Sequence, residues 1–277
     1  MLACTYTLLG LGVTLIYGAM RVINLAAGQF LMIGAYATFW LFTLLGVSPL
    51  LSVGVTAIIG AFLGMVVNFA MFRPAIRKAA NVSAIEGNSV VLTFALGIAL
   101  EAAAAILWQP IPRVYRPLPR VYDFHGLSLP ESYLAICSVT IVVLSAMYLF
   151  LRRSRWGRAI RYGIQDNTGA GLVGVDLQRV FLLCSVLGIS IACLTGVFYG
   201  LLYQTLPSIG GEYTLVAWVV VVIGGAGSMT GAIVGGVIIG LVETVGVYLT
   251  SSSLRVSITY LVLVIILLFR PKGLFRA

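Results

Sequence analysis

Two acidic residues interrupt long apolar stretches of the sequence and could do chemistry inside a membrane. Glu101 and Glu243 each lie about halfway along a stretch that is otherwise free of charge. A charged carboxylate at the centre of a bilayer costs on the order of 3 kcal/mol, so each must face other helices, find a donor or take up a proton. Both are candidates for a solute or proton path, and the alternative is hydrogen bonding between helices. We expect no basic counter-ion, because Arg255 lies beyond the Glu243 stretch.

Asn24 and Gln29 bring carboxamides to the short segment NLAAGQF, where the chain turns from its first apolar stretch to its second. An amide can cap a helix end or form hydrogen bonds with a polar solute. Capping is the favoured interpretation, and a place on the solute path is the alternative.

Other chemistry is largely excluded. The sequence contains no GxxxxGK[ST], GxGxxG or GxSxG motif, so the chain does not hold a nucleotide by such a loop. Its one histidine, His125, lies in a proline-rich connector, and its four cysteines form no CxxC pair. We therefore expect no catalytic residues, no metal, no cofactor and no enzymatic activity, so that any ATP is hydrolysed on separate subunits.

The composition identifies the elements that must position these side chains. Apolar residues make up 61% of the chain and charged residues 9%, and the mean hydropathy is +1.09. That is too little charge to cover a water-exposed globule, so we predict one all-α transmembrane domain, residues 1–277, with eight or nine membrane segments. These segments are predicted near residues 2–20, 25–46, 50–72, 89–109, 133–151, 180–203, 214–224, 231–250 and 256–269.

The distribution of Lys and Arg residues indicates how the chain is oriented in the membrane. If the N-terminus lies outside, 13 of the 17 Lys and Arg residues fall in cytoplasmic segments, as does the C-terminus. The net charge of +9 is thus a topology signal, and we expect no nucleic-acid partner. The segment GGAGSMTG, residues 224–231, is predicted to be either a tight turn or a broken helix within the membrane.

Two connectors are long enough to have a role. Residues 110–132 should form an extended external loop because they are rich in proline. Residues 152–179 form the longest cytoplasmic connector, in which Asn167 or Thr168 could cap a short helix. Its apolar residues are Ala170, Leu172, Val173 and Val175. An apolar cluster is costly to leave in water, which favours a docking element over a solvated loop.

Four stretches taken together resemble one family. They are GLGVTLIYGAMRVINLAAGQFLMIGAY at 10–36, GRAIRYGIQDNTGAGLVGVDLQRV at 157–180, VVVVIGGAGSMTGAIVGGVIIGLVE at 219–243 and LLFRPKGLF at 267–275. In order and spacing they resemble branched-chain amino acid ABC transporter permeases of the LivH type. The resemblance implies an importer in a prokaryotic inner membrane. Its partners would be a second homologous permease, two cytoplasmic ATPase subunits and an extracytoplasmic solute-binding protein.

On this resemblance the 157–180 segment is the ATPase-coupling element. Its implied coupling residues are Asp166, Thr168, Ala170, Leu172, Val173 and Gly174. Relatives commonly have Glu-Ala-Ala before the glycine that corresponds to Gly174, where this chain has Thr168, Gly169 and Ala170. Many relatives also read Asn-Phe-Ala-His-Gly-Glu where this chain reads NLAAGQ, so a charge-dependent role there is unsupported. Several more residues usually precede the first span in the family, which implies either a shortened N-terminus or a misassigned start.

The resemblance favours a branched-chain or other hydrophobic amino acid as the solute. The same machinery also serves urea, short amides and aromatic acids, and the composition does not choose among them. A rival of another class is a proton-coupled carrier that works without ATPases and uses Glu101 or Glu243 as its proton site.

Overall fold

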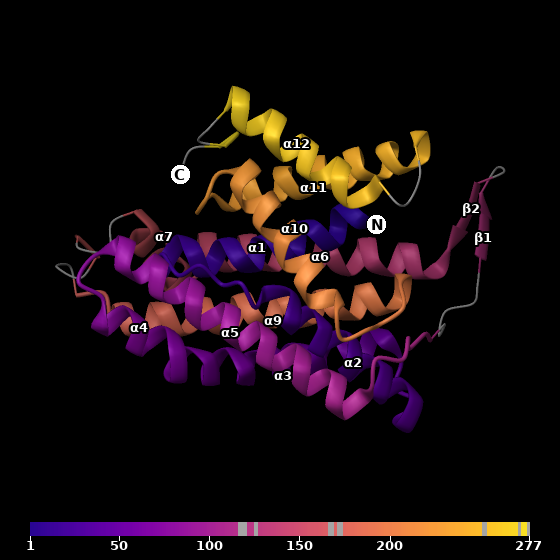
Figure 1. The fold of residues 1–277 in the computed structure, drawn as a ribbon, viewed down its shortest axis with the longest axis horizontal. Coiled ribbons are helices and arrows are strands. Elements are labelled where there is room, and N and C mark those ends of the chain that lie inside the picture. The colour runs from indigo at the N-terminus through magenta and orange to yellow at the C-terminus, as the bar shows by residue number, and fades with distance from the viewer. Residues whose placement is uncertain are drawn as a thin grey trace.

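The protein is a bundle of helices lying mostly along one direction (Figure 1). A computed structural model describes residues 1–115, 121–124, 127–165, 169–170, 174–250, 254–270 and 273–275. Seven helical segments in this described part are long and apolar enough to cross a membrane, and two shorter apolar helices accompany them. The prediction of a polytopic helical permease fold is confirmed.

The elements follow one another in this order: α1 (Leu2–Met20), α2 (Ala27–Leu45), α3 (Pro49–Val67), the π-helical turn η1 (Asn68–Phe72), α4 (Arg73–Lys78), α5 (Val82–Trp108), β1 (Val121–Phe124), β2 (Leu127–Pro130), α6 (Glu131–Arg153), α7 (Arg155–Gln165), α9 (Leu177–Leu202), α10 (Ile209–Gly224), α11 (Met229–Leu249) and α12 (Arg255–Phe269). The predicted segments correspond to these helices. The connector 110–132 adds one feature to the all-α prediction, because β1 and β2 pair there as an antiparallel hairpin.

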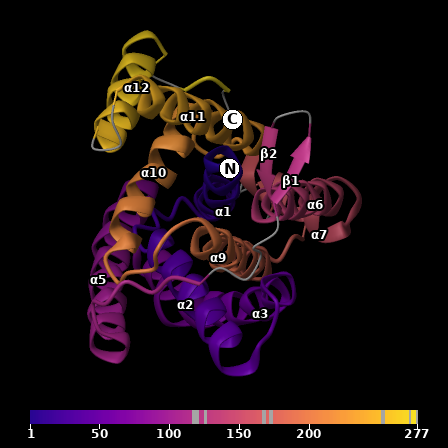
Figure 2. The same ribbon diagram turned by 90° about the vertical axis from the view of Figure 1, so that its right-hand side faces the viewer.

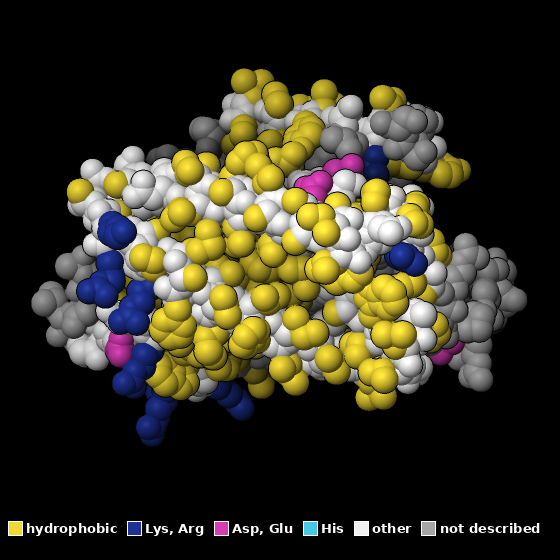
Figure 3. Space-filling view, turned by 60° about the horizontal axis from the view of Figure 1, so that its bottom comes forward, with side chains coloured by type: hydrophobic (Ala, Val, Ile, Leu, Met, Phe, Trp, Pro, Cys, Tyr) yellow, Lys and Arg dark blue, Asp and Glu magenta, His cyan; other side chains and the backbone are white. Residues whose placement is uncertain are grey.

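The two ends of the bundle differ in charge. The N-terminus and the β1–β2 hairpin lie toward one end, which we call the outer end (Figure 1). Lys and Arg side chains gather at the opposite end, around α4 and α7, which we call the inner end (Figure 3). Between the two ends the visible face is mostly hydrophobic, as expected where lipid chains or another membrane subunit cover a surface.

The core lies around α1, α2 and α9. Of the most apolar window in each helix, 78% is buried in α1 and 67% in α9, but only 17% in α5, which stands at one side of the bundle (Figure 2). Small residues let the central backbones approach closely: a Cβ on Gly34 would lie 1.9 Å from the carbonyl oxygen of Cys193. Most of the α5 surface is therefore exposed in this chain and available for contact with other subunits or ligands.

Two membrane crossings begin with non-helical backbone. After α1 the chain returns into the bundle over residues 21–26, so α2 begins beside the middle of α5 and not at the inner end (Figure 1). Its amides are satisfied by α5: the Ile23 amide donates to Ser89 Oγ (2.9 Å), and the Leu25 amide donates to Thr93 Oγ1 (3.0 Å). The predicted second span, from residue 25, does not include this non-helical entry. Hydroxyl side chains make irregular backbone tolerable at membrane depth.

The second entry precedes α10. Residues 203–208 are non-helical, and α10 begins at Ile209, earlier than the predicted residue 214. It then runs to the inner end, where the segment 224–231 is a tight turn and not a broken helix. Gly225 and Gly227 have φ of 99° and 91°, which favours glycine, and Ser228 Oγ caps α11 by accepting from the Gly231 amide (3.1 Å).

Candidate functional site

A pocket of about 230 Å³ lies between α2, α5 and α10. Its polar lining comes from Gln29, Glu101 and Thr214, one on each helix. Its apolar lining comes from Leu25, Phe94, Ile98 and Leu215, and glycines 97 and 211 complete it. We call this the mid-depth pocket, because Gly97 lies near the middle of α5.

The N-terminal ends of α2 and α10 meet at this pocket. The Gly28 amide donates to Thr214 Oγ1 (2.8 Å), and a Cβ on Gly28 would lie 1.9 Å from the carbonyl oxygen of Gly210. Only a residue without a side chain permits that crossing. The Gly28, Gln29 and Phe30 amides already have acceptors, but the first turn of each helix carries a partial positive charge, so the two ends together favour a negative group nearby.

Gln29 is held tightly between glycines. Its side chain lies against Gly97 and Gly210, and the residue is only 4% exposed. The Thr214 hydroxyl lies 3.3 Å from Gln29 Oε1, and it also reaches the Gly210 carbonyl oxygen at 2.9 Å. For Gln29 Nε2 the structure shows no hydrogen-bond partner among the residues it describes. This amide group is a donor available at the pocket.

The other polar residues predicted from the sequence do not all meet here. Glu101 lines the mid-depth pocket and is partly exposed, and no described basic side chain pairs with it. Asn24 is 1% exposed and does not line it. Asn24 Oδ1 accepts a hydrogen bond from the Ala26 amide (3.0 Å), and its carbonyl oxygen accepts one from Trp218 Nε1 (3.1 Å). Asn24 therefore fixes the non-helical entry.

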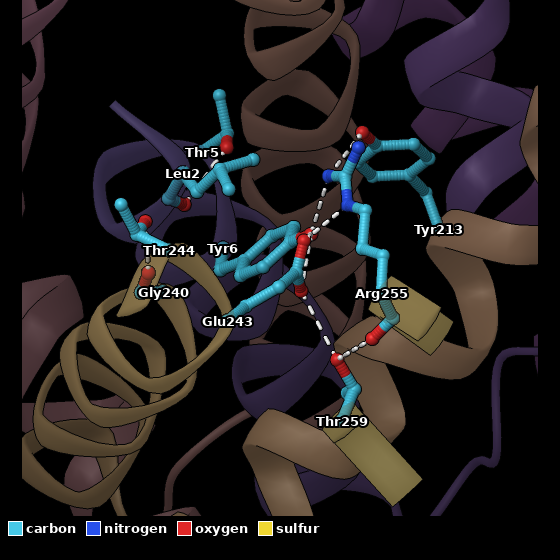
Figure 4. Close-up of polar contacts among 9 residues, drawn as sticks. All are labelled: Leu2, Thr5, Tyr6, Tyr213, Gly240, Glu243, Thr244, Arg255 and Thr259. Carbon is cyan, nitrogen blue, oxygen red and sulfur yellow. Dashed lines mark hydrogen bonds and ion pairs between the residues drawn. The ribbon is translucent and has the colours of Figure 1, made fainter. Parts of the chain in front are cut away.

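Glu243 belongs to a separate cluster (Figure 4), which includes Tyr6 of α1 near the N-terminus and so lies toward the outer end. The Tyr6 hydroxyl lies 2.9 Å from both carboxylate oxygens, and the Thr259 hydroxyl donates to Oε2 (3.0 Å). Arg255 Nε also donates to this carboxylate, although the sequence suggested that Glu243 has no basic partner. That expectation is wrong, because α12 packs against α11 and so brings Arg255, at its start, to Glu243.

Aromatic rings enclose Arg255. Its Nη2 atom donates to the hydroxyls of Tyr6 (2.8 Å) and Tyr213 (3.2 Å), and its guanidinium lies 5.2 Å from the ring centroid of Tyr203. Tyr203 lies just beyond the end of α9. The cluster joins α1, α10, α11 and α12.

Glu212 is a carboxylate that sequence reasoning missed. It lies in the first turn of α10 and lines a second pocket of about 220 Å³ together with Arg255 and Glu243. The predicted span from residue 214 left it in a connector. An acidic residue shortly before an apolar run is typical of a helix N-terminus, and that signal could have extended the helix to include it.

The predicted coupling segment is described only in part. Four of its six implied coupling residues, Asp166, Thr168, Leu172 and Val173, lie outside the described residues, as does the N-cap candidate Asn167. Ala170 is 4% exposed, and its carbonyl oxygen accepts a hydrogen bond from the Val175 amide (3.1 Å). Gly174 has φ of 81°, and its Cα faces open space.

The helix α7 within this segment has two distinct faces. Gly157 and Ile160 are buried against the bundle, whereas Trp156 and Tyr162 are 45% and 57% exposed. Arg155, Arg158 and Arg161 are exposed beside them. The outward face of α7 is thus both aromatic and basic.

Comparison with known proteins gives a consistent result. The family described as branched-chain amino acid transport system / permease component matches residues 1–269. The high-affinity branched-chain amino acid transport system permease protein BraD of Pseudomonas aeruginosa is 30% identical over 283 residues, which cover 98% of this chain and 91% of that protein.

Two further relatives agree. The permease protein LivH of the corresponding Escherichia coli system is 28% identical over 288 residues, covering 99% of this chain and 92% of LivH. A probable branched-chain amino acid transport permease protein LivH of Methanocaldococcus jannaschii is 26% identical over 280 residues, covering 96% and 87%. No solved structure matches this chain.

Proposed function

The chain belongs to the branched-chain amino acid transport permease family, and we propose that it is one membrane-spanning subunit of an ABC importer that carries a hydrophobic amino acid into the cytoplasm. In this proposal the N-terminus and the hairpin face outward, and the basic inner end faces the cytoplasm. A second permease completes the path, and two ATPases drive it. A binding protein delivers the solute.

The observation that carries this proposal is the chemistry of the mid-depth pocket. An amino acid is a zwitterion with an apolar side chain. The paired N-termini of α2 and α10, together with Gln29 Nε2, suit its carboxylate. Glu101 suits its ammonium group, and Phe94, Ile98 and Leu215 suit its side chain. Urea and short amides lack these charges and would leave Glu101 unpaired.

Exposed surfaces accommodate the proposed partners. The outward side of α5 is apolar, with Val91, Phe94 and Ile98 exposed by more than half, and it suits a second permease across the solute path. The outward face of α7, with Trp156 and Tyr162, suits the ATPase beside the 166–174 segment. Movement of that segment would reach the pocket through α1 and α9, on which α7 packs.

The proton-coupled rival gains less support from the same contacts. Glu243 already accepts hydrogen bonds from Tyr6, Thr259 and Arg255, so protonating it would leave the Arg255 charge without its partner. Glu101 is the remaining candidate for a proton site.

Uptake in reconstituted vesicles tests the proposal. The chain would be assembled with its second permease, two ATPases and binding protein, and uptake of radiolabelled leucine would be measured with and without ATP and a protonophore. We expect uptake that requires ATP and survives the protonophore. We also expect Glu101→Gln to raise KM at least tenfold, whereas Glu131→Gln, at the start of α6, leaves KM unchanged.

The reverse pattern, uptake that needs no ATP and is abolished by the protonophore, would replace the importer with the proton-coupled carrier. If uptake requires ATP but Glu101→Gln leaves KM unchanged, the importer stands and the mid-depth pocket is not its solute site.

A further inference from the structure

A larger cavity, of about 370 Å³, lies at the inner end between the η1–α4 segment and the start of α9. Its basic lining comes from Arg73, Arg77 and Arg179, which reach it from two elements. Phe69, Ile76 and Phe181 provide apolar lining next to them. We call it the inner basic pocket. It lies far along the bundle from the mid-depth pocket and shares no lining residue with it.

Two of these arginines have no carboxylate partner. In the described part of the chain the only ion pairs are Arg179–Asp176 (2.9 Å) and Arg255–Glu243. Arg73 donates from Nη2 to the neutral Gln178 side chain (2.7 Å), and its Nε atom is buried without a hydrogen-bond partner. Asp176 also lines the cavity, but three arginines outnumber this one carboxylate, so the cavity keeps a net positive charge. Its unused guanidinium donors suit the paired oxygens of a phosphate group.

The apolar side of the pocket continues along the membrane. Phe69 is 51% exposed, and the outward face of α3 extends from it through Val66, Met65 and Phe62, exposed by 45% to 65%. A basic cavity at the end of the helices, opening onto a hydrophobic strip that runs toward mid-membrane, matches the shape of a phospholipid. A soluble anion would use the arginines and leave this strip unused.

We propose that the inner basic pocket binds an anionic phospholipid. Its phosphate lies among Arg73, Arg77 and Arg179, and its acyl chains cover Phe69 and the outward face of α3. The π-helical turn η1 joins α3 to α4, and Arg73 at the start of α4 contacts Gln178 on α9, which brings the basic residues of the two elements together at the headgroup site. This site is independent of the proposed solute path.

Native mass spectrometry of the purified full chain tests the site. Detergent micelles would contain equal amounts of phosphatidylglycerol and phosphatidylcholine, and the lipids that stay bound would be counted. We expect phosphatidylglycerol to be retained in preference, and this preference to fall about fivefold for each arginine replaced in Arg73→Gln and Arg73→Gln/Arg77→Gln. Arg179→Gln gives an independent variant should the double variant fail to fold.

A matched control separates this site from general basicity. Arg155→Gln/Arg158→Gln removes two exposed arginines of α7 at the same end, outside the pocket, and should leave the preference unchanged. Equal loss in the control, or none in the pocket variants, would overturn the proposal. So would displacement of the lipid by millimolar inorganic phosphate or glycerophosphoglycerol, which would identify a soluble-anion site. Loss of the lipid on ATPase binding would mean that the ATPase covers the pocket instead.

Discussion

Arg255 Nε donates to the carboxylate of Glu243, and this contact holds the start of α12 against the outer half of α11. The Glu243 side chain is 2% exposed and that of Arg255 is 28% exposed, so the acidic partner depends on the pair more than the basic one does. Removing the arginine would leave the nearly buried Glu243 carboxylate without a compensating charge.

We therefore expect Arg255→Ala to destabilise the protein by on the order of 3 kcal/mol, because it strands the Glu243 carboxylate. Thermal melting in detergent, followed by circular dichroism, measures the loss. Adding Glu243→Gln to Arg255→Ala should restore much of the melting temperature, since a neutral amide keeps its contacts with Tyr6 and Thr259 without a stranded charge. If the single variant melts like the wild type, the pair contributes nothing to stability.

Because α2 and α10 cross so closely, adding one methyl group at the crossing should strongly destabilise the protein. Gly28→Ala would place its Cβ 1.9 Å from the Gly210 carbonyl oxygen, which forces the helices apart and costs about 1–3 kcal/mol or more. Because the crossing lies at the mid-depth pocket, Gly28→Ala should also reduce leucine uptake by the reconstituted assembly. Gly54→Ala on α3 is the matched control, since no atom lies within 4 Å of the added Cβ. It should be neutral or slightly stabilising, and equal effects at both sites would refute the close crossing.

Thiol labelling can locate the solute. Ile98→Cys lies in the mid-depth pocket, whereas Val82→Cys lies at the start of α5, outside the pocket, and is 55% exposed. In a background with the native cysteines replaced by serine, we expect excess leucine to slow labelling of position 98 by a small maleimide in the assembled transporter. Labelling at position 82 should not respond. Protection at neither position would remove the pocket from the solute path.

Asp176 begins α9 and offers a test at the inner end. Its Oδ1 atom accepts from the amides of Gln178 (3.1 Å) and Arg179 (3.3 Å), as an N-cap does. Asp176→Ala should destabilise by about 1 kcal/mol, while Asp176→Asn should be close to neutral because its amide oxygen still caps the helix. Melting curves of the three proteins decide this. Equal destabilisation by alanine and asparagine would assign the effect to the exposed Asp176–Arg179 ion pair instead.

Hydropathy and charge determined much of this protein. Apolar stretches long enough to cross a membrane gave the helices, and the clustering of basic residues at one end follows from where Lys and Arg fall between them. The motif-bearing stretches at 10–36, 157–180 and 219–243 were sufficient to indicate the family, which the comparison confirms. These properties depend on local composition and order, so no knowledge of packing was needed.

The candidate site could be predicted only in part from the sequence. Glu101 and Gln29 could be singled out as polar groups in apolar surroundings, but only the tertiary structure brings them into one pocket and places Glu243 in another. The pairing of Glu243 with Arg255 depends on contacts between different helices. The non-helical entry at 21–26 likewise depends on contacts with α5, which is far away in the sequence. The Ser89 and Thr93 hydroxyl oxygens accept hydrogen bonds from the amides of that entry, which stabilises irregular backbone inside the bundle. Hydropathy does not identify such partners.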